Sequence, residues 1–121
     1  MKRVLYGAPA TATIASLCVG AFLVAAFQAH SLIDVIWSSH AGTSTVLWGP
    51  FVAGEPLGLL RALTSGFMHL DITHLTVNVL MLVAVGAAVE RAVGTGPFVL
   101  AYLAGVLGGS AAVLILSLIH I

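Results

Sequence analysis

The chain has 121 residues, of which 60% are hydrophobic and only 7% are charged, and its basic and acidic residues are equal in number. A soluble domain carries about a quarter charged residues, so this composition excludes a protein with a water-facing surface and predicts one embedded in a lipid bilayer. The few cations form no basic patch that could grip phosphates, which argues against a nucleic-acid partner.

The first predicted transmembrane helix covers about residues 10–29, an uncharged stretch long enough to cross the hydrocarbon core. Lys2 and Arg3 precede it and, by the positive-inside bias, place the N-terminus in the cytoplasm. A secretory signal has an apolar core of only about 7 to 15 residues, so we favour an uncleaved anchor. Cys18 is the single cysteine, so neither a disulfide framework nor a thiolate metal cluster is expected.

A mixed segment follows at about residues 30–65, with glycines, prolines, a few charges and the aromatic residues Trp37, Trp48 and Phe51. A loop of this length is uncommon unless it has a function. Because tryptophan is a common anchor at the headgroup level, we predict an interfacial loop in the outer leaflet. An ordinary extracytoplasmic loop is an equally good interpretation.

Two further apolar runs predict transmembrane helices at about residues 73–89 and 98–119. The pair Glu90-Arg91 and the Gly/Pro-rich residues 94–97 are expected to end the second helix on the cytoplasmic side. The sequence therefore predicts an all-α, polytopic helical membrane protein with about three transmembrane helices.

Small residues in the third run recur every four positions, at Ala101, Gly105 and Gly109. Residues at this spacing line one helix face and allow another backbone to approach closely, so we expect a partner helix on that face. The chain stops at Ile121 without a polar flank, which we interpret as an interrupted sequence.

A polar stretch, HLDITHLTVN, opens the second apolar run. His74 and Asn78 in this stretch are one helical turn apart on one face, and both can donate hydrogen bonds. Polar groups inside a membrane normally face the bundle interior or a water-filled cavity. Two donors that converge on such a cavity are what an oxyanion hole for acyl transfer needs.

Spacing alone favours a simpler alternative for this pair, in which both side chains only hold neighbouring helices together at about 0.6 kcal/mol each. A metal site is not expected, because Asp71, His74 and nearby His69 form no His-Glu-x-x-His motif and lack a clear third ligand.

Residues 59–114, LLRALTSGFMHLDITHLTVNVLMLVAVGAAVERAVGTGPFVLAYLAGVLGGSAAVL, resemble the rhomboid family of intramembrane serine proteases. The residues that carry the resemblance are Arg61, Phe67-Met68-His69, His74-x-x-x-Asn78 and Gly86-x-x-x-Glu90-Arg91-x-x-Gly94, followed by a Gly-rich third helix.

The resemblance implies an enzyme that cleaves transmembrane or membrane-adjacent peptide bonds with a Ser–His dyad and without a metal or organic cofactor. It implies oxyanion stabilisation by His74 and Asn78 and a supporting role for His69. It also implies a multi-pass protein, which we expect in the plasma membrane of a prokaryote, with transmembrane proteins as substrates.

The chain departs from the family pattern at the nucleophile and the base. The family's Gly-x-Ser-Gly and its later histidine lie on a fourth and a sixth helix, which this sequence lacks. Ser110 is expected to be packing material in a Gly-rich helix, and His120 has no structure to hold it in hydrogen-bond reach of a serine. The chain alone is therefore predicted to be inactive, as the N-terminal part of a rhomboid-like domain.

Smaller departures concern the charged residues and the first loop. Leu60 stands where rhomboids commonly have tryptophan before the matched Arg61, which predicts a less secure docking of the loop. For Arg61 a headgroup-facing side chain is the simpler alternative, and for Glu90-Arg91 a plain pair of charges at a helix end.

Two other functional classes are compatible with the sequence. One is a non-catalytic rhomboid-like protein that binds transmembrane segments. The other is a small structural membrane subunit in which His74 and Asn78 only pin helices together.

Overall fold

The computed structural model describes residues 5–45, 47 and 60–119. Within this part of the chain every regular element is a helix. Three helical stretches, Pro9–Ala29, Ile72–Val93 and Thr95–Leu116, are long and apolar enough to cross a membrane. The predicted all-α membrane architecture with about three transmembrane helices is confirmed. Predictions that concern Lys2, Arg3, Trp48, Phe51 and His120 fall on residues outside the described ranges.

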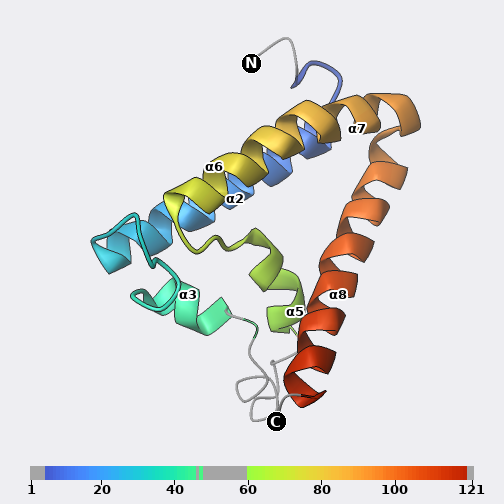
Figure 1. Cartoon of the computed structure of the whole chain (residues 1–121). Coiled ribbons are helices and arrows are strands. Elements are labelled where there is room, and N and C mark those ends of the chain that lie inside the picture. Colours follow the sequence, from blue (N-terminus) through green and yellow to red (C-terminus); the bar gives the residue numbers. More distant parts are fainter. Residues whose placement is uncertain (1–4, 46, 48–59, 120–121) are drawn as a thin grey trace.

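Two antiparallel layers of helix make up the upper part of the molecule (Figure 1). Helix α2 (Pro9–Ala29) lies beside α6 (Ile72–Met81) and α7 (Ala87–Val93). A π-helical turn, η2 (Leu82–Gly86), joins α6 to α7, so that the two form one continuous transmembrane stretch. Helix α8 (Thr95–Ile119) then leaves this pair at a steep angle.

The break between α7 and α8 is shorter than the sequence suggested. Helix α7 continues through Glu90 and Arg91, and only Gly94 interrupts the chain before α8 begins at Thr95. Gly94 has φ +91°, a left-handed conformation that favours glycine, and its N–H donates to the Glu90 carbonyl at 2.8 Å. Pro97 continues α8 because proline is tolerated in the first turn of a helix.

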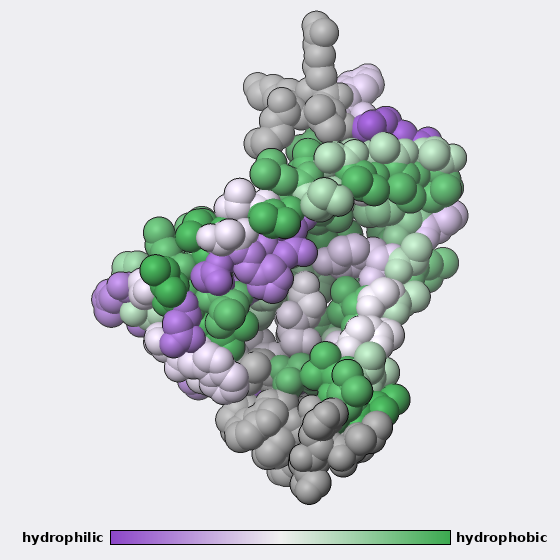
Figure 2. Space-filling model, viewed as in Figure 1, coloured by the Kyte–Doolittle hydropathy of each residue, from purple (hydrophilic) through white to green (hydrophobic). Residues whose placement is uncertain are grey.

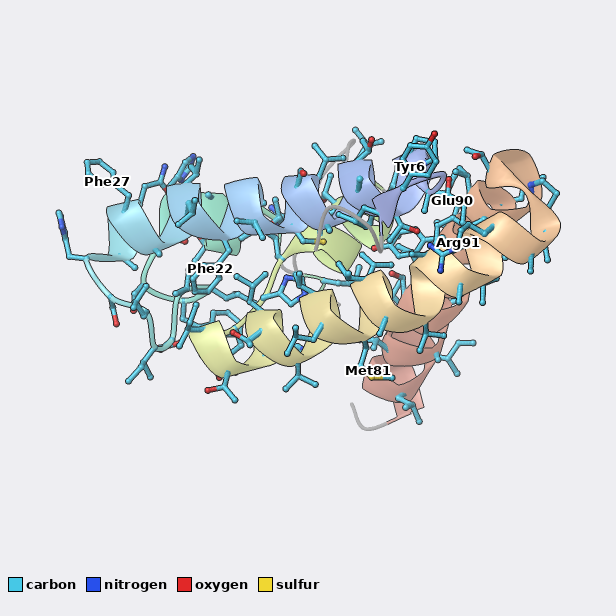
Figure 3. All side chains as sticks on the ribbon, turned by 90° about the horizontal axis from the view of Figure 1, so that it is seen from above. Tyr6, Phe22, Phe27, Met81, Glu90 and Arg91 are labelled. Atoms are coloured by element: carbon cyan, nitrogen blue, oxygen red, sulfur yellow. The ribbon has the colours of Figure 1, made fainter. Side chains whose placement is uncertain are left out.

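The buried core lies where α2 faces α6 and the start of α8. Phe22 is its largest fully buried apolar side chain and points from α2 toward α6 (Figure 3). The apolar residues of this cluster are Ile14, Cys18, Phe22, Ala25, Ala26, Val35, Leu75 and Phe98. Most other large apolar side chains face outward, as expected for helices that lipid surrounds.

A short helical segment, α5 (Leu60–Thr64) followed by the 3₁₀ turn η1 (Ser65–Phe67), packs against α8. A Cβ atom on Gly66 would lie 2.6 Å from a methyl group of Val106, so only glycine permits this approach. Lower on the same helix, the Ser110 hydroxyl donates to the Ala62 carbonyl at 2.6 Å. Ser110 therefore has the packing role that the sequence predicted.

The small-residue face of α8 does not pack within the described part of the chain. Ala101, Gly105 and Gly109 are exposed, and a Cβ atom on either glycine would meet nothing within 4 Å. The inward face lies one position further along the helix and includes Phe98, Tyr102, Val106 and Ser110. A partner helix for the small residues stays a prediction.

Hydrogen bonds tie helix α3 (His40–Thr45) of the first loop to α5 and to the end of α2. Helix α3 receives the Arg61 guanidinium, whose Nη1 donates to the Thr43 carbonyl at 2.9 Å. The Ala41 N–H donates to the Gln28 side chain at the end of α2. Arg61 is buried, which corrects the alternative of a headgroup-facing side chain, and it docks the loop despite Leu60.

The Glu90 carboxylate, which comes from α7, binds the first turn of α2. Helix α2 begins at Pro9 and receives no side-chain cap from the residue before it. Glu90, only 1% exposed, instead accepts from the N–H groups of Ala10 and Thr11 at 2.9 and 2.7 Å. The hydroxyls of Thr11 and Thr95 also donate to it, each at 2.8 Å. Figure 3 places Glu90 and Arg91 beside the start of α2; Glu90 is not the plain helix-end charge considered from sequence.

We predict that Glu90→Ala lowers the free energy of unfolding by roughly 2–4 kcal/mol, because it leaves buried donors without an acceptor. Thr95→Ala removes one donor and is expected to cost about 1 kcal/mol. Equilibrium unfolding in mixed detergent micelles measures both. The control is Thr13→Ala, whose hydroxyl only bonds the Pro9 carbonyl of its own helix; an equal loss in this variant would contradict the capping role.

Candidate active site

Asp71 determines where α6 begins and so positions His74. Asp71 is extended, and its carboxylate accepts from the His74 N–H at 2.8 Å as the N-cap of the helix. A carboxylate is favoured here because the helix N-terminus carries partial positive charge. Asp71, at which no metal site was expected from the sequence, thus has a structural role as the N-cap of α6.

His74 and Asn78 lie on one exposed face of α6, as their spacing predicted. The Asn78 amide donates through Nδ2 to the His74 carbonyl at 2.8 Å. This bond uses one of the two amide hydrogens and fixes the orientation of the side chain, which leaves the second N–H to meet another acceptor. On the side of the molecule seen in Figure 2, hydrophilic side chains gather near the middle, with hydrophobic surface above them and to their left.

His69 lies beside His74 but is buried. The two imidazole rings meet edge to face with their centroids 5.2 Å apart, and His69 is only 6% exposed. Its Nδ1 has no hydrogen-bond partner in the described part of the protein. Burial lowers the pKa of His69 and the neighbouring His74 lowers it further, while the Phe67 backbone acts in the opposite direction.

A pocket of about 260 Å³ lies between α2, α6, η1 and α8. Its polar lining comes from His69, Asn78, Cys18 and Tyr102, and its apolar lining includes Val79, Met81 and Leu82. His74 is beside this pocket through its contact with His69 rather than part of the lining. The structure therefore brings together the three site residues that the sequence singled out.

Two backbone hydrogen bonds hold the segment between His69 and α6 in place. The Val35 N–H donates to the Leu70 carbonyl at 2.8 Å, and the Ile72 N–H donates to the Leu32 carbonyl at 3.0 Å. The loop that follows α2 thus fixes residues 70–72 from the outside, while the pocket borders His69 from the inside.

Sequence reasoning missed the contribution of Cys18 and Tyr102 to the pocket. Cys18 recurs with Ile14, Phe22 and Ala25 on the buried face of α2, a spacing visible in the sequence. Tyr102 lies on the inward face of α8, and its ring centroid is 6.2 Å from that of Phe67. Among the described residues, no three His, Cys, Asp or Glu side chains form a group that could hold a metal ion.

The geometry defines a helical membrane protein with a polar site at the start of a transmembrane helix. Comparison with protein-family models matches residues 56–119 to the rhomboid domain, so the chain belongs to the rhomboid family. It is also 47% identical over 57 residues to the rhomboid protease GluP of Bacillus subtilis (strain 168). That match covers 47% of this chain and 11% of the relative. No solved structure matches the chain significantly.

We predict that Asp71→Ala destabilises the start of α6 by about 0.5–2 kcal/mol through loss of the N-cap. Hydrogen exchange at the His74 amide, which donates to this carboxylate, reports the change directly. Asp71→Asn keeps a capping oxygen and serves as the matched control, so equally fast exchange in both variants would exclude capping as the reason.

Proposed function

We propose that this chain supplies the oxyanion-stabilising part of an intramembrane serine endopeptidase. The observation that carries the proposal is the pair His74 and Asn78, which share an exposed face of α6 with the Asn78 amide already oriented by the His74 carbonyl. Membership of the rhomboid family and similarity to a relative described as a rhomboid protease support it.

In the proposed reaction a serine hydroxyl attacks the scissile carbonyl and gives its proton to a histidine base. The carbonyl electrons move to oxygen, where N–H donors from His74 and Asn78 stabilise the developing charge. Collapse of this intermediate breaks the peptide bond, and the protonated base delivers its proton to the leaving amine. Water then hydrolyses the acyl-enzyme by the same route.

The nucleophile and the base come from residues other than those described here. The Ser110 hydroxyl is unsuited because it donates to the Ala62 carbonyl on the α5 side of α8. His69 has a supporting role, since its ring contacts that of His74 and borders the same pocket as Asn78. By itself the 121-residue chain is expected to cleave nothing, and the chemistry requires no cofactor.

The proposed substrates are transmembrane proteins that enter from the bilayer. The chain is a multi-pass membrane protein by its three apolar helices, and we propose a cytoplasmic N-terminus in the plasma membrane of a prokaryote. The polar start of α6 then lies toward the outer face, where water reaches the scissile bond.

A second candidate function is binding of transmembrane segments without cleavage. The exposed face formed by Ala101, Gly105 and Gly109 favours it, because small residues permit close approach of another helix in a membrane. On this hypothesis the site residues hold a partner helix in place and no acyl transfer occurs.

A chimera separates these functions. Residues 56–119 replace the corresponding segment of the B. subtilis relative, and cleavage of a transmembrane reporter is measured in proteoliposomes. We expect the chimera to cleave the reporter, and His74→Ala or Asn78→Ala to lower kcat about 10²–10³-fold, the usual loss for one oxyanion donor.

Two control variants make the result specific. Thr76→Ala changes an exposed residue of the same helix that bonds only the Ile72 carbonyl, and Ser110→Ala removes the hydroxyl that faces Ala62. Both are expected to retain kcat. A chimera that folds and binds the reporter but does not cleave it would support the second function, and retained kcat without His74 and Asn78 would refute the first.

A further inference from the structure

His69 is held in place from several directions without a hydrogen bond at Nδ1. It follows η1 directly and lies two residues before the N-cap of α6. Its ring borders the pocket between α2 and α8 and meets the edge of His74. The described contacts of this side chain are therefore mainly packing contacts, which suit an uncharged ring.

Protonation of this ring has three separate costs. It places a charge on a side chain that is 94% buried, since only 6% is exposed. It adds a hydrogen to a ring whose Nδ1 has no hydrogen-bond partner in the described part of the chain, a cost that the Phe67 backbone offsets only in part. It also brings a positive charge within contact of His74, so that the second ring can no longer gain a proton without repulsion.

We propose that His69 is a proton-sensitive latch: the neutral ring seats residues 68–71 between the first loop and the pocket, and the charged ring releases them. Among the described residues, the backbone hydrogen bonds from Val35 to Leu70 and from Ile72 to Leu32 connect this segment to the first loop. Opening at the latch is thus expected to weaken these bonds first. The latch requires no catalytic step and stands independently of the proposed protease function.

The direction of the pH dependence follows from the lowered pKa of His69. The seated state binds fewer protons than the released state, in which histidine has its usual pKa of about 6.5. The contribution of the neutral His69 ring to the stability of the seated state is therefore fully present above that pH. It falls as the pH drops from there toward the lower pKa of the seated ring.

Other titratable groups face His69 from each neighbouring element. Cys18 comes from α2 and Tyr102 from α8, and both classes of side chain ordinarily titrate well above neutral pH. Asp71 and His74 come from the start of α6, where the Asp71 carboxylate binds the His74 N–H. His74 is the neighbouring imidazole, so the test must separate the two histidines.

The test is amide hydrogen exchange at Val35 and Ile72 in the full chain in lipid nanodiscs between pH 4.5 and 8, corrected for intrinsic exchange. In the native sequence, we expect the opening equilibrium constant measured at both amides to rise about tenfold for each unit by which the pH falls. This dependence covers the window between the two pKa values of His69. His69→Phe keeps a ring of similar shape that cannot gain a proton and is expected to abolish this dependence. His40→Gln, at an exposed histidine of α3, should behave like the native sequence.

Three outcomes would overturn the latch. They are opening that does not depend on pH in the native chain, an unchanged rise of opening at low pH in His69→Phe, and loss of that rise in His40→Gln. Should His69→Phe fail to fold, NMR titration of histidine-labelled native chain decides. A His69 ring that titrates below about 6.5 and in step with the opening of Ile72 supports the latch, whereas a ring that titrates at or above about 6.5, or out of step with that opening, refutes it.

Discussion

The Glu90 carboxylate at the start of α2 is the interaction on which the arrangement of the helices depends. Amide groups in the first turn of a helix have no partner within that helix, and inside a membrane no water replaces one. Helix α2 lacks a local cap, and Glu90 supplies two acceptor oxygens from 80 residues away. This bond aligns α2 with α6 and α7, and so sets where the polar start of α6 lies relative to the pocket.

Burial of a carboxylate is tolerated here because every partner donates to it. Backbone N–H groups and threonine hydroxyls surround Glu90, while the neighbouring Arg91 packs its side chain near Gly7. At the opposite end of the helix pair, Asp71 caps α6 in the same way but from the adjacent residue. Two acidic side chains thus define the two ends of the antiparallel pair, in a chain with very few charges.

The features that could be predicted correctly from the sequence are those that depend on the local pattern of residue types. Apolar run length predicted three membrane-crossing helices, and four-residue spacing placed His74 and Asn78 on one face. Contacts between distant segments were not predictable: the spacing of Ala101, Gly105 and Gly109 identifies a helix face, but not whether it points inward. The bond from Arg61 to Thr43 and the capping role of Glu90 likewise depend on tertiary packing, which neither propensity nor hydropathy encodes.

The π-helical turn at Leu82–Gly86 restricts how the chain length can vary. A π turn accommodates one more residue than an α turn, and each residue of an α-helix adds about 100° of rotation. Deletion of a single residue within this turn would therefore convert it to an α turn and keep Glu90 facing α2, whereas deletion of a residue between Asn78 and this turn would rotate Glu90 away from α2. The number of residues between the two polar ends of this helix can therefore change by one only within the π turn.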